Sequence, residues 1–190
     1  MDEITKFILE LDALKLVQRR TYISGGLRAE NSAEHSWHLA LSSWLLAKRL
    51  KRNYSIEKLL KLALIHDLGE IDPGDTFLYD KNRNEAVKRE SECVSRLAND
   101  HGNSIDELFE LWEEQEYGKS PEAKFLKVID RLVPFLHNMT SGGKTWKDNN
   151  ISLSEVLKAY KFIENEEPEI YSWLVENLDK AVQKGWLKNS

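Results

Sequence analysis

The sequence predicts an all-α protein, a single-domain bundle of helices, and three observations lead to that fold class. The chain of 190 residues has only nine glycines and four prolines, so long segments run without a helix breaker. Most of these segments repeat their apolar residues every three or four positions, as amphipathic helices do. Alternating runs rich in Val, Ile and Thr, which would indicate strands, are nearly absent. We therefore expect one domain over residues 1–190, a length that suits a single core.

Apolar periodicity and capping residues set the expected helices in order along the chain. The first helix is expected from about Asp2 to Gln18, and a loop from Thr21 to Glu30 follows it. Several later starts carry a capping box, such as Ser152 with Glu155, or a proline at the first helical position. Further helices are expected at about residues 31–52, 55–67, 85–99, 105–117, 121–139, 152–165 and from 168 onward, with loops at 70–82 and 141–144.

Composition excludes several classes of protein and partner. Acidic residues outnumber basic ones, 32 to 27, so a nucleic-acid polymer is not an expected partner. Cys93 is the single cysteine, which rules out an intrachain disulfide and a CxxC motif and fits a reducing, cytoplasmic environment. The start Met1-Asp2-Glu3 does not resemble a signal peptide, and no apolar run approaches ~18 residues, so no membrane association is expected.

The predicted helix at residues 55–67 is apolar on almost every side, yet it ends in His66 and Asp67. A helix of this kind should lie at the centre of the bundle, where an ionised carboxylate needs a cation, a hydrogen-bond donor or a proton. In the simpler alternative, the pair points to solvent or forms hydrogen bonds with the following loop.

Two further polar residues interrupt apolar helices. Asp130 shares an inward stripe with Leu126 and Val133 at helical spacing, and His35 lies in the first turn of its helix. The alternative for Asp130 is a salt bridge to a basic residue such as Arg131 or Lys127. The alternative for His35 is an ordinary hydrogen-bonded histidine of the core.

Together, these helices supply two imidazoles and two carboxylates, a set that suits a divalent metal ion in a mixed nitrogen and oxygen site. No cluster of thiolates is available, so a cysteine-type structural zinc site is excluded. His66 and Asp67 are neighbours that could share an ion at a helix end, and they lie just before Gly69 at such an end. Mn, Co, Fe, Ni and Zn all tolerate this ligand set, so the identity of the ion stays open.

The order and spacing of these residues resemble the H…HD…D signature of the HD superfamily of metal-dependent phosphohydrolases. Within that superfamily, the chain is most similar to the 5'-deoxynucleotidase branch, which includes the HD domain-containing protein 2 type. The resemblance covers about residues 10–140, and its matching stretches are Leu14–Arg19 (LKLVQR), Arg28–Ser36 (RAENSAEHS), His66–Glu70 (HDLGE), Gly74-Asp75, and Trp112–Glu116 (WEEQE) followed by Pro121–Lys124 (PEAK).

The resemblance implies an all-helical HD domain with one divalent ion and hydrolysis of a phosphate monoester, best known for deoxynucleoside 5'-monophosphates. The implied metal ligands are His35, His66, Asp67 and Asp130. Glu70 and Asp75 are implied to be catalytic, and Arg19 and Asp75 to contact the phosphorylated substrate.

Other expectations concern the base, the sugar and the oligomer. Trp37 could form a wall of a nucleobase site, although a large aromatic residue in a bundle is also typical of a core. Arg20 stands where deoxynucleotidase members have tryptophan, which leaves the preference for deoxyribose over ribose open. A homodimer is implied by the family, with Trp173 and Trp186 of the last helix as candidates for its interface.

Competing interpretations remain open. The first is a non-enzymatic HD-type module that senses nucleotides or binds a protein and keeps a metal for stability. The second is a structural helical protein whose histidines and aspartates are ordinary salt-bridge partners, and a phosphodiesterase or triphosphohydrolase is a third. Glu70 distinguishes the first from an enzyme, because a module that only binds needs no carboxylate there.

Overall fold

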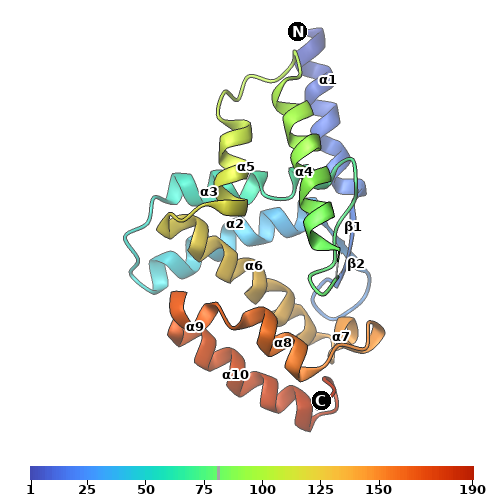
Figure 1. The fold of residues 1–190 in the computed structure, drawn as a ribbon, viewed down its shortest axis with the longest axis vertical. Helices are drawn as coiled ribbons and strands as arrows, with labels where there is room; N and C mark the ends of the chain where they lie inside the picture. The colour runs from blue at the N-terminus through green and yellow to red at the C-terminus, as the bar shows by residue number, and fades with distance from the viewer. Residues whose placement is uncertain (81) are drawn as a thin grey trace. The chain divides into compact units, whose positions relative to one another are not determined.

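The computed structural model describes residues 1–80 and 82–190, which form helices joined by short loops and one two-stranded sheet (Figure 1). The α-helices are α1 Asp2–Leu11, α2 Ser32–Arg49, α3 Ile56–Ile65, α4 Arg83–Ala98, α5 Leu108–Tyr117, α6 Pro121–Thr140, α7 Lys144–Asp148, α8 Leu153–Tyr160, α9 Ile163–Glu166 and α10 Pro168–Gln183. Short 3-10 helices cover Asp12–Leu16 and Leu68–Glu70, and the strands are β1 Gln18–Tyr22 and β2 Ala29–Asn31. The predicted all-α class is confirmed. Across the described residues, no helix combines the length and the apolar character that a bilayer crossing requires.

The chain divides into two compact units, and each is assembled from two separate stretches of sequence. The first unit contains residues 1–19 and 31–126, and the second contains residues 20–30 and 127–190. A compact unit need not fold independently as a domain. The expected single HD domain over residues 1–190 therefore stays a prediction.

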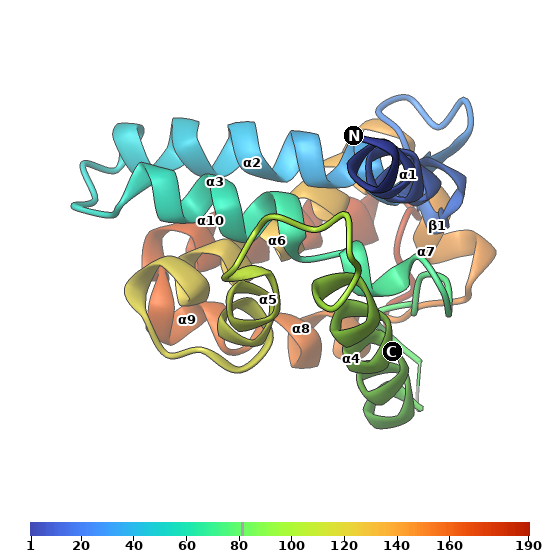
Figure 2. The ribbon, with the colours of Figure 1, turned by 90° about the horizontal axis from the view of Figure 1, so that it is seen from above.

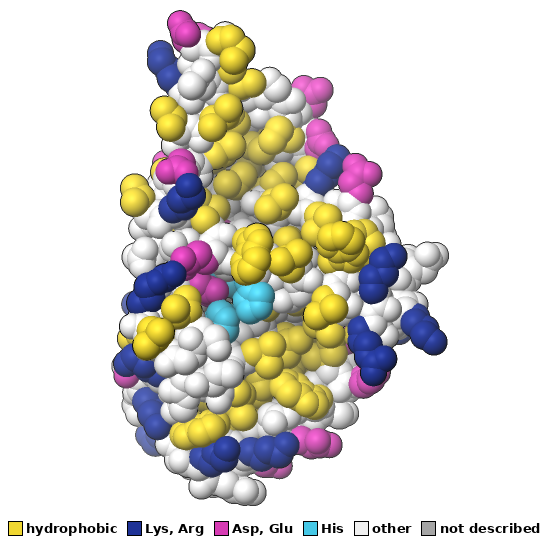
Figure 3. Space-filling model, turned by 180° about the vertical axis from the view of Figure 1, so that it is seen from behind, with side chains coloured by type: hydrophobic (Ala, Val, Ile, Leu, Met, Phe, Trp, Pro, Cys, Tyr) yellow, Lys and Arg dark blue, Asp and Glu magenta, His cyan; other side chains and the backbone are white. Residues whose placement is uncertain are grey.

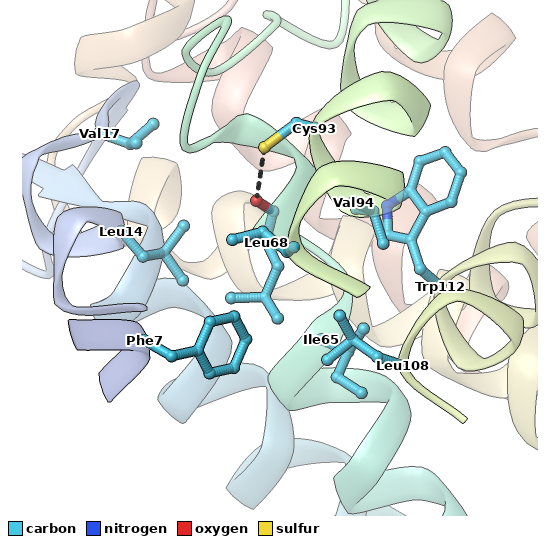
Figure 4. Packing of buried hydrophobic residues seen from close by; sticks show 10 residues of the cluster. Phe7, Leu14, Val17, Ile65, Leu68, Cys93, Val94, Leu108 and Trp112 are labelled. Atoms are coloured by element: carbon cyan, nitrogen blue, oxygen red, sulfur yellow. Dashed lines mark hydrogen bonds between the residues drawn. The ribbon is translucent and has the colours of Figure 1, made fainter. Parts of the chain in front are cut away.

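An apolar core fills the first unit, and Leu68 lies near its centre (Figure 4). Around Leu68 are buried side chains from α1, α4, α5 and the first 3-10 helix, among them Phe7, Leu14, Val94 and Trp112. The Sγ of Cys93 donates a hydrogen bond to the Leu68 carbonyl at 3.6 Å. Burial raises the pKa of the Cys93 thiol to about 11, so the thiol keeps the proton that this bond needs. The core thus anchors the short helix that directly follows His66 and Asp67.

Helices α2 and α3 lie side by side in the first unit (Figure 2). A capping box starts α2, because the Asn31 side chain accepts from the Glu34 amide and the Glu34 carboxylate accepts from the Asn31 amide. Ser55 caps α3, which ends at Ile65. The predicted starts of both helices and the predicted end of α3 next to His66-Asp67 therefore agree with the structure.

Aromatic rings form the core of the second unit. The ring of Phe135 on α6 lies 5.7 Å from that of Trp146 on α7, 6.3 Å from Tyr160 on α8 and 5.9 Å from Trp173 on α10, measured between centroids. Gly143 has a positive φ of 73°, and a Cβ there would lie 2.2 Å from a backbone oxygen in the chain's last turn. The loop between α6 and α7 therefore needs glycine at that position.

Two expectations about local structure are wrong. The helix expected from Asp2 to Gln18 ends at Leu11, continues as a 3-10 helix to Leu16, and gives way to strand β1. The loop expected from Thr21 to Glu30 is shorter than predicted, because its first two residues end β1 and its last two begin β2, and the two strands pair. Strands of five and three residues are too short to show a clear alternation of apolar and polar residues. Pairing with the neighbouring strand, and not the local sequence pattern, defines them.

Candidate functional site

The first unit brings together six of the residues that the sequence singled out. His35 comes from α2, His66 and Asp67 follow the end of α3, and Glu70 ends the second 3-10 helix. All four are buried, and the ring centroids of His35 and His66 are 5.3 Å apart. The other two are Arg19 of β1 and Asp75 of the loop that follows the second 3-10 helix.

The end of α3 explains how two adjacent residues can serve one site. The His66 amide still donates to the Leu62 carbonyl at 3.0 Å, as in a helix. Asp67 then leaves the helical conformation, with φ −96° and ψ 3°, and the Glu70 amide donates to its carbonyl at 3.0 Å. Neighbours inside a helix point about 100° apart, so this change of backbone direction is what lets both side chains face each other.

The contacts of His66 fit a bound cation. Its Nδ1 lies 3.0 Å from the Ala63 carbonyl, which can only accept, so Nδ1 carries a hydrogen in that bond. Its Nε2 lies 2.9 Å from the Asp67 Oδ1. In a neutral ring, Nε2 would then present a lone pair to a carboxylate, and a proton or a metal ion is needed between them. Two imidazoles and a carboxylate are also a donor set that divalent transition metals favour.

Arg19 connects Asp67 to Asp75. Its Nη1 donates to the Asp67 Oδ2 at 2.8 Å and lies 3.5 Å from the Asp75 Oδ1, and all three side chains are largely buried. Burial acts to raise the pKa of Asp67, but the His66 ring and the Arg19 guanidinium outweigh it and lower that pKa to about 2. Asp67 is therefore ionised at neutral pH, as a metal ligand must be.

Glu70 has the opposite electrostatic environment. Burial raises the pKa of its carboxyl well above the usual range, the charges of Asp67 and Asp75 raise it further, and Arg19 and Ser32 oppose the shift. The Ser32 Oγ donates to the Glu70 Oε2 at 2.6 Å. Two carboxyls in one site thus have pKa values shifted in opposite directions, an arrangement typical of acid–base chemistry.

Gly69 allows α4 to pack against this part of the site. A Cβ at Gly69 would lie 2.9 Å from the Cβ of Glu90 and 3.0 Å from its carbonyl oxygen. Any side chain here would push the 3-10 helix and α4 apart, which would displace the neighbouring Glu70. The glycine in the His66–Glu70 stretch therefore has a packing role.

Asp130 and Trp37 are the two remaining predicted site residues. Asp130 belongs to the second unit, where its side chain is 19% exposed and pairs with Arg131, the salt bridge expected as the alternative to metal binding. Its role as a fourth ligand stays a prediction. Trp37 is 62% exposed on α2, whereas His35, two residues earlier, is fully buried.

Sequence reasoning missed two groups of polar contacts. Ser32 is not among the predicted site residues, and nothing local in the sequence indicates its bond to Glu70, 38 residues away. In the second unit, the buried Glu30 carboxylate accepts from the Thr21 Oγ1 at 3.2 Å and lies 3.8 Å from the His137 Nδ1. A buried carboxylate needs such partners, but the sequence gives no sign of which residues supply them.

The chain is similar to known proteins in both sequence and fold. The model of the HD domain family matches residues 11–171, most of the chain. The chain therefore belongs to the HD domain family.

Two named relatives illustrate its place in that family. The human protein 5'-deoxynucleotidase HDDC2 is 30% identical over 137 residues, which are 70% of this chain and 65% of the human protein. The zebrafish protein of the same name is 30% identical over 135 residues, 70% of this chain and 66% of that protein. The match thus spans just under two thirds of these relatives' length.

A solved structure shares almost the whole fold. It is described as a predicted metal-dependent phosphohydrolase from Magnetospirillum magnetotacticum MS-1 and is 34% identical to this chain, with a TM-score of 0.87. The similarity covers 97% of this chain and 93% of that one. A conserved hypothetical protein from Pyrococcus furiosus is more distant, with 27% identity and a TM-score of 0.63.

Proposed function

We propose that this chain is a metal-dependent phosphohydrolase that removes phosphate from a small phosphate monoester, and that a nucleoside or deoxynucleoside 5'-monophosphate is the substrate. One observation carries the proposal: a buried arginine fork, a low-pKa carboxylate and a high-pKa carboxyl lie together at the end of α3. The names of the relatives support the same reaction.

His35, His66 and Asp67 would hold one divalent ion, with Asp130 as the fourth ligand. Support for Asp130 comes from its place in the H…HD…D pattern that the sequence shares with the HD family. A divalent ion bound there would lower the pKa of a water molecule bound to it and would withdraw charge from a phosphoryl oxygen. Which of Mn, Co, Fe, Ni or Zn is used stays open.

Arg19 binds the phosphate in this proposal. A guanidinium offers two parallel N–H donors to phosphate oxygens, and such charge-assisted bonds are strongest where water is excluded. Asp75 lies 3.5 Å from the same Nη1 and would hold the guanidinium on the substrate side. The role of Trp37 as a wall for the base stays a separate prediction.

Glu70 transfers the proton. Because its pKa is raised by burial and by two nearby carboxylates, the carboxyl can hold a proton much closer to neutral pH than a solvated glutamate. It can then protonate the leaving oxygen or take a proton from the attacking water. A positioned acid or base of this kind is worth about 10²–10⁴-fold in rate.

A phosphate-release screen tests the proposal. Purified protein is incubated with ribo- and deoxyribonucleoside 5'-monophosphates and each candidate ion, and free phosphate is measured. Asp67→Ala should lose both metal content and activity, while Asp12→Ala, which removes an exposed carboxylate of the same unit, should keep both. Full metal content in Asp67→Ala would contradict the ligand assignment. Metal binding without phosphate release from any nucleotide would favour the non-enzymatic module instead.

A homodimer is part of the proposal, and α2 offers a surface for it. Hydrophobic side chains gather on the face shown in Figure 3. On α2, Trp37, Leu41, Trp44 and Leu45 are 43–69% exposed at spacings that place them on one helical face. In a two-fold dimer, this stripe would meet its own copy, so apolar surface would cover apolar surface.

The dimer proposal has its own measurement. Light scattering should give twice the chain mass for the wild type and the single mass for Leu45→Glu. A monomeric wild type would contradict it. Trp173, expected at the interface, packs against Phe135 but stays 43% exposed, so Trp173→Ala tests the alternative surface in the same assay.

A reducing cytosol remains the compartment we propose, because Cys93 is a free, buried thiol.

A further inference from the structure

We propose that Ser32 is a positioning residue that holds the Glu70 carboxyl in one orientation. The inference rests on the proposed function of Glu70. It adds a residue that neither the sequence motifs nor the comparisons assign.

The backbone fixes Ser32 on both sides. Its amide donates to the Val17 carbonyl at 3.0 Å, and its own carbonyl accepts from the Ser36 Oγ at 2.9 Å. The preceding residue, Asn31, caps the helix, so Ser32 begins α2 in a defined conformation. Ser32 has no solvent exposure. The backbone of Ser32, and with it the Cβ that carries the hydroxyl, is therefore held by contacts that do not involve Glu70.

The bond to Glu70 is short and buried. The Ser32 Oγ to Glu70 Oε2 distance of 2.6 Å lies in the range of an O–H donor paired with a carboxylate. It engages one carboxyl oxygen and leaves the other for water or for a leaving group. A buried carboxyl that lost this partner would have to find another donor or remain without a replacement for its lost solvation.

A hydroxyl suits a group that gains and loses a proton. It can donate to the Glu70 carboxylate and, by rotating its hydrogen, accept from the protonated carboxyl. An amide N–H or a lysine ammonium can only donate, so it could not accept a hydrogen bond from a proton on that same carboxyl oxygen. Ser32 can therefore keep the same contact through a complete proton-transfer cycle.

Ser32 also links Glu70 to the phosphate-binding segment. Val17, which accepts the Ser32 amide bond, precedes Arg19 by two residues at the start of β1. Two hydrogen bonds of Ser32 thus connect the Glu70 carboxyl to the segment that carries Arg19. Errors of about 1 Å in such geometry can cost up to about 100-fold in rate.

Steady-state kinetics of the metal-loaded wild type and variants test the role. In Ser32→Ala, we expect kcat to fall about 10–100-fold, with KM and bound metal within twofold of wild type. Ser32→Thr, which keeps the hydroxyl, should restore most of kcat. Ser43→Ala is the matched control, because Ser43 is a fully buried serine of the same helix, three turns further on. Its kinetics should match the wild type.

The outcomes separate this inference from the proposed function. A wild-type kcat in Ser32→Ala, while Glu70→Gln is inactive, would overturn the role of Ser32 alone. An equal loss in Ser43→Ala, or a loss of metal or of melting temperature that parallels the loss of kcat, would show a structural role and would also overturn it. If the wild type releases no phosphate, the proposed function fails and this inference fails with it. If Ser32→Thr fails to fold, the kcat values of Ser32→Ala and Ser43→Ala decide whether Ser32 has a positioning role.

Discussion

At the scale of residues, the site depends on buried charges that compensate one another. Asp67 and Asp75 flank the Arg19 guanidinium, and the three side chains are at most 12% exposed. In so dry an environment, removing one partner leaves the others without compensation, an effect larger than the median surface ion pair. Substitutions of Arg19 should therefore have effects that a solvent-facing arginine would not show.

Arg19→Ala should raise KM for a nucleotide substrate by at least about tenfold, which corresponds to about 1.4 kcal/mol of lost binding. The physical reason is the loss of the donor fork that we assign to the phosphate. Arg19→Lys keeps the charge without the fork and should fall between wild type and Arg19→Ala. Kinetics at saturating metal measure both variants. An unchanged KM in Arg19→Ala would remove Arg19 from the phosphate site.

The site residues differ in how far the sequence could predict them. His35, His66 and Asp67 stand out because polar groups interrupt apolar helices, and their family spacing then adds Glu70, Arg19 and Asp75. Ser32 could not be found this way. A serine after a helix cap is ordinary, and the bond that distinguishes it spans 38 residues of sequence.

At the scale of elements, the short helix Leu68–Glu70 positions the site, and α4 packs against that helix. Arg96 of α4 donates to both carboxylate oxygens of Asp72, at 3.0 and 2.8 Å, and pairs with Glu10 of α1. Contacts at Gly69 and at Asp72 thus hold the segment before and after Glu70.

Gly69→Ala should lower the free energy of unfolding by about 1–3 kcal/mol, because the added methyl group collides with the backbone of Glu90. Chemical denaturation of the variant and of the wild type measures the difference. A Gly69→Ala protein as stable as the wild type would contradict the packing argument.

Arg96→Ala should cost about 0.5–1 kcal/mol at neutral pH, a modest value because both partners are partly solvent-exposed. The hydrogen bond from Arg96 lowers the pKa of Asp72 in the folded state. The stabilisation that Arg96 provides through Asp72 is therefore fully present above the pKa of Asp72 in the unfolded chain, about 3.9. It is lost as the pH falls through the pKa of Asp72 in the folded state. Denaturation curves should show the two proteins converging below about pH 4, and a constant difference down to pH 2 would contradict this.

Element boundaries show what local pattern can and cannot predict. The starts of α2, α3 and α6 agree with expectation, because capping residues and a proline act within one turn of the helix they begin. The helix expected to reach Gln18 ends seven residues earlier, at Leu11, although apolar spacing continues through Leu14 and Val17. Pairing between β1 and β2 is a tertiary interaction, so it overrides periodicity without a local signal.

At the scale of the whole molecule, the proposed metal site would couple ion binding to stability. An ion that binds only the folded chain stabilises it by RT ln(1 + [L]/Kd), about 2.7 kcal/mol at 100 times Kd. The wild type should therefore melt at higher temperature with added ion and lose the gain with a chelator, whereas Asp67→Ala should respond to neither. Calorimetry with each candidate ion measures this. An equal gain in Asp67→Ala would show that the ion binds elsewhere.

The two compact units have a consequence for the order of folding during synthesis. The second unit is built from residues 20–30 and 127–190, and the intervening stretch belongs to the first unit. A ribosome adding about 5–20 residues per second needs roughly 5–20 s to cross that stretch. During this time, Tyr22 and Ser24 have not yet met Asp148 and Thr140, their hydrogen-bonding partners in the finished unit. The second unit therefore can be completed only late in translation, when its C-terminal helices leave the exit tunnel.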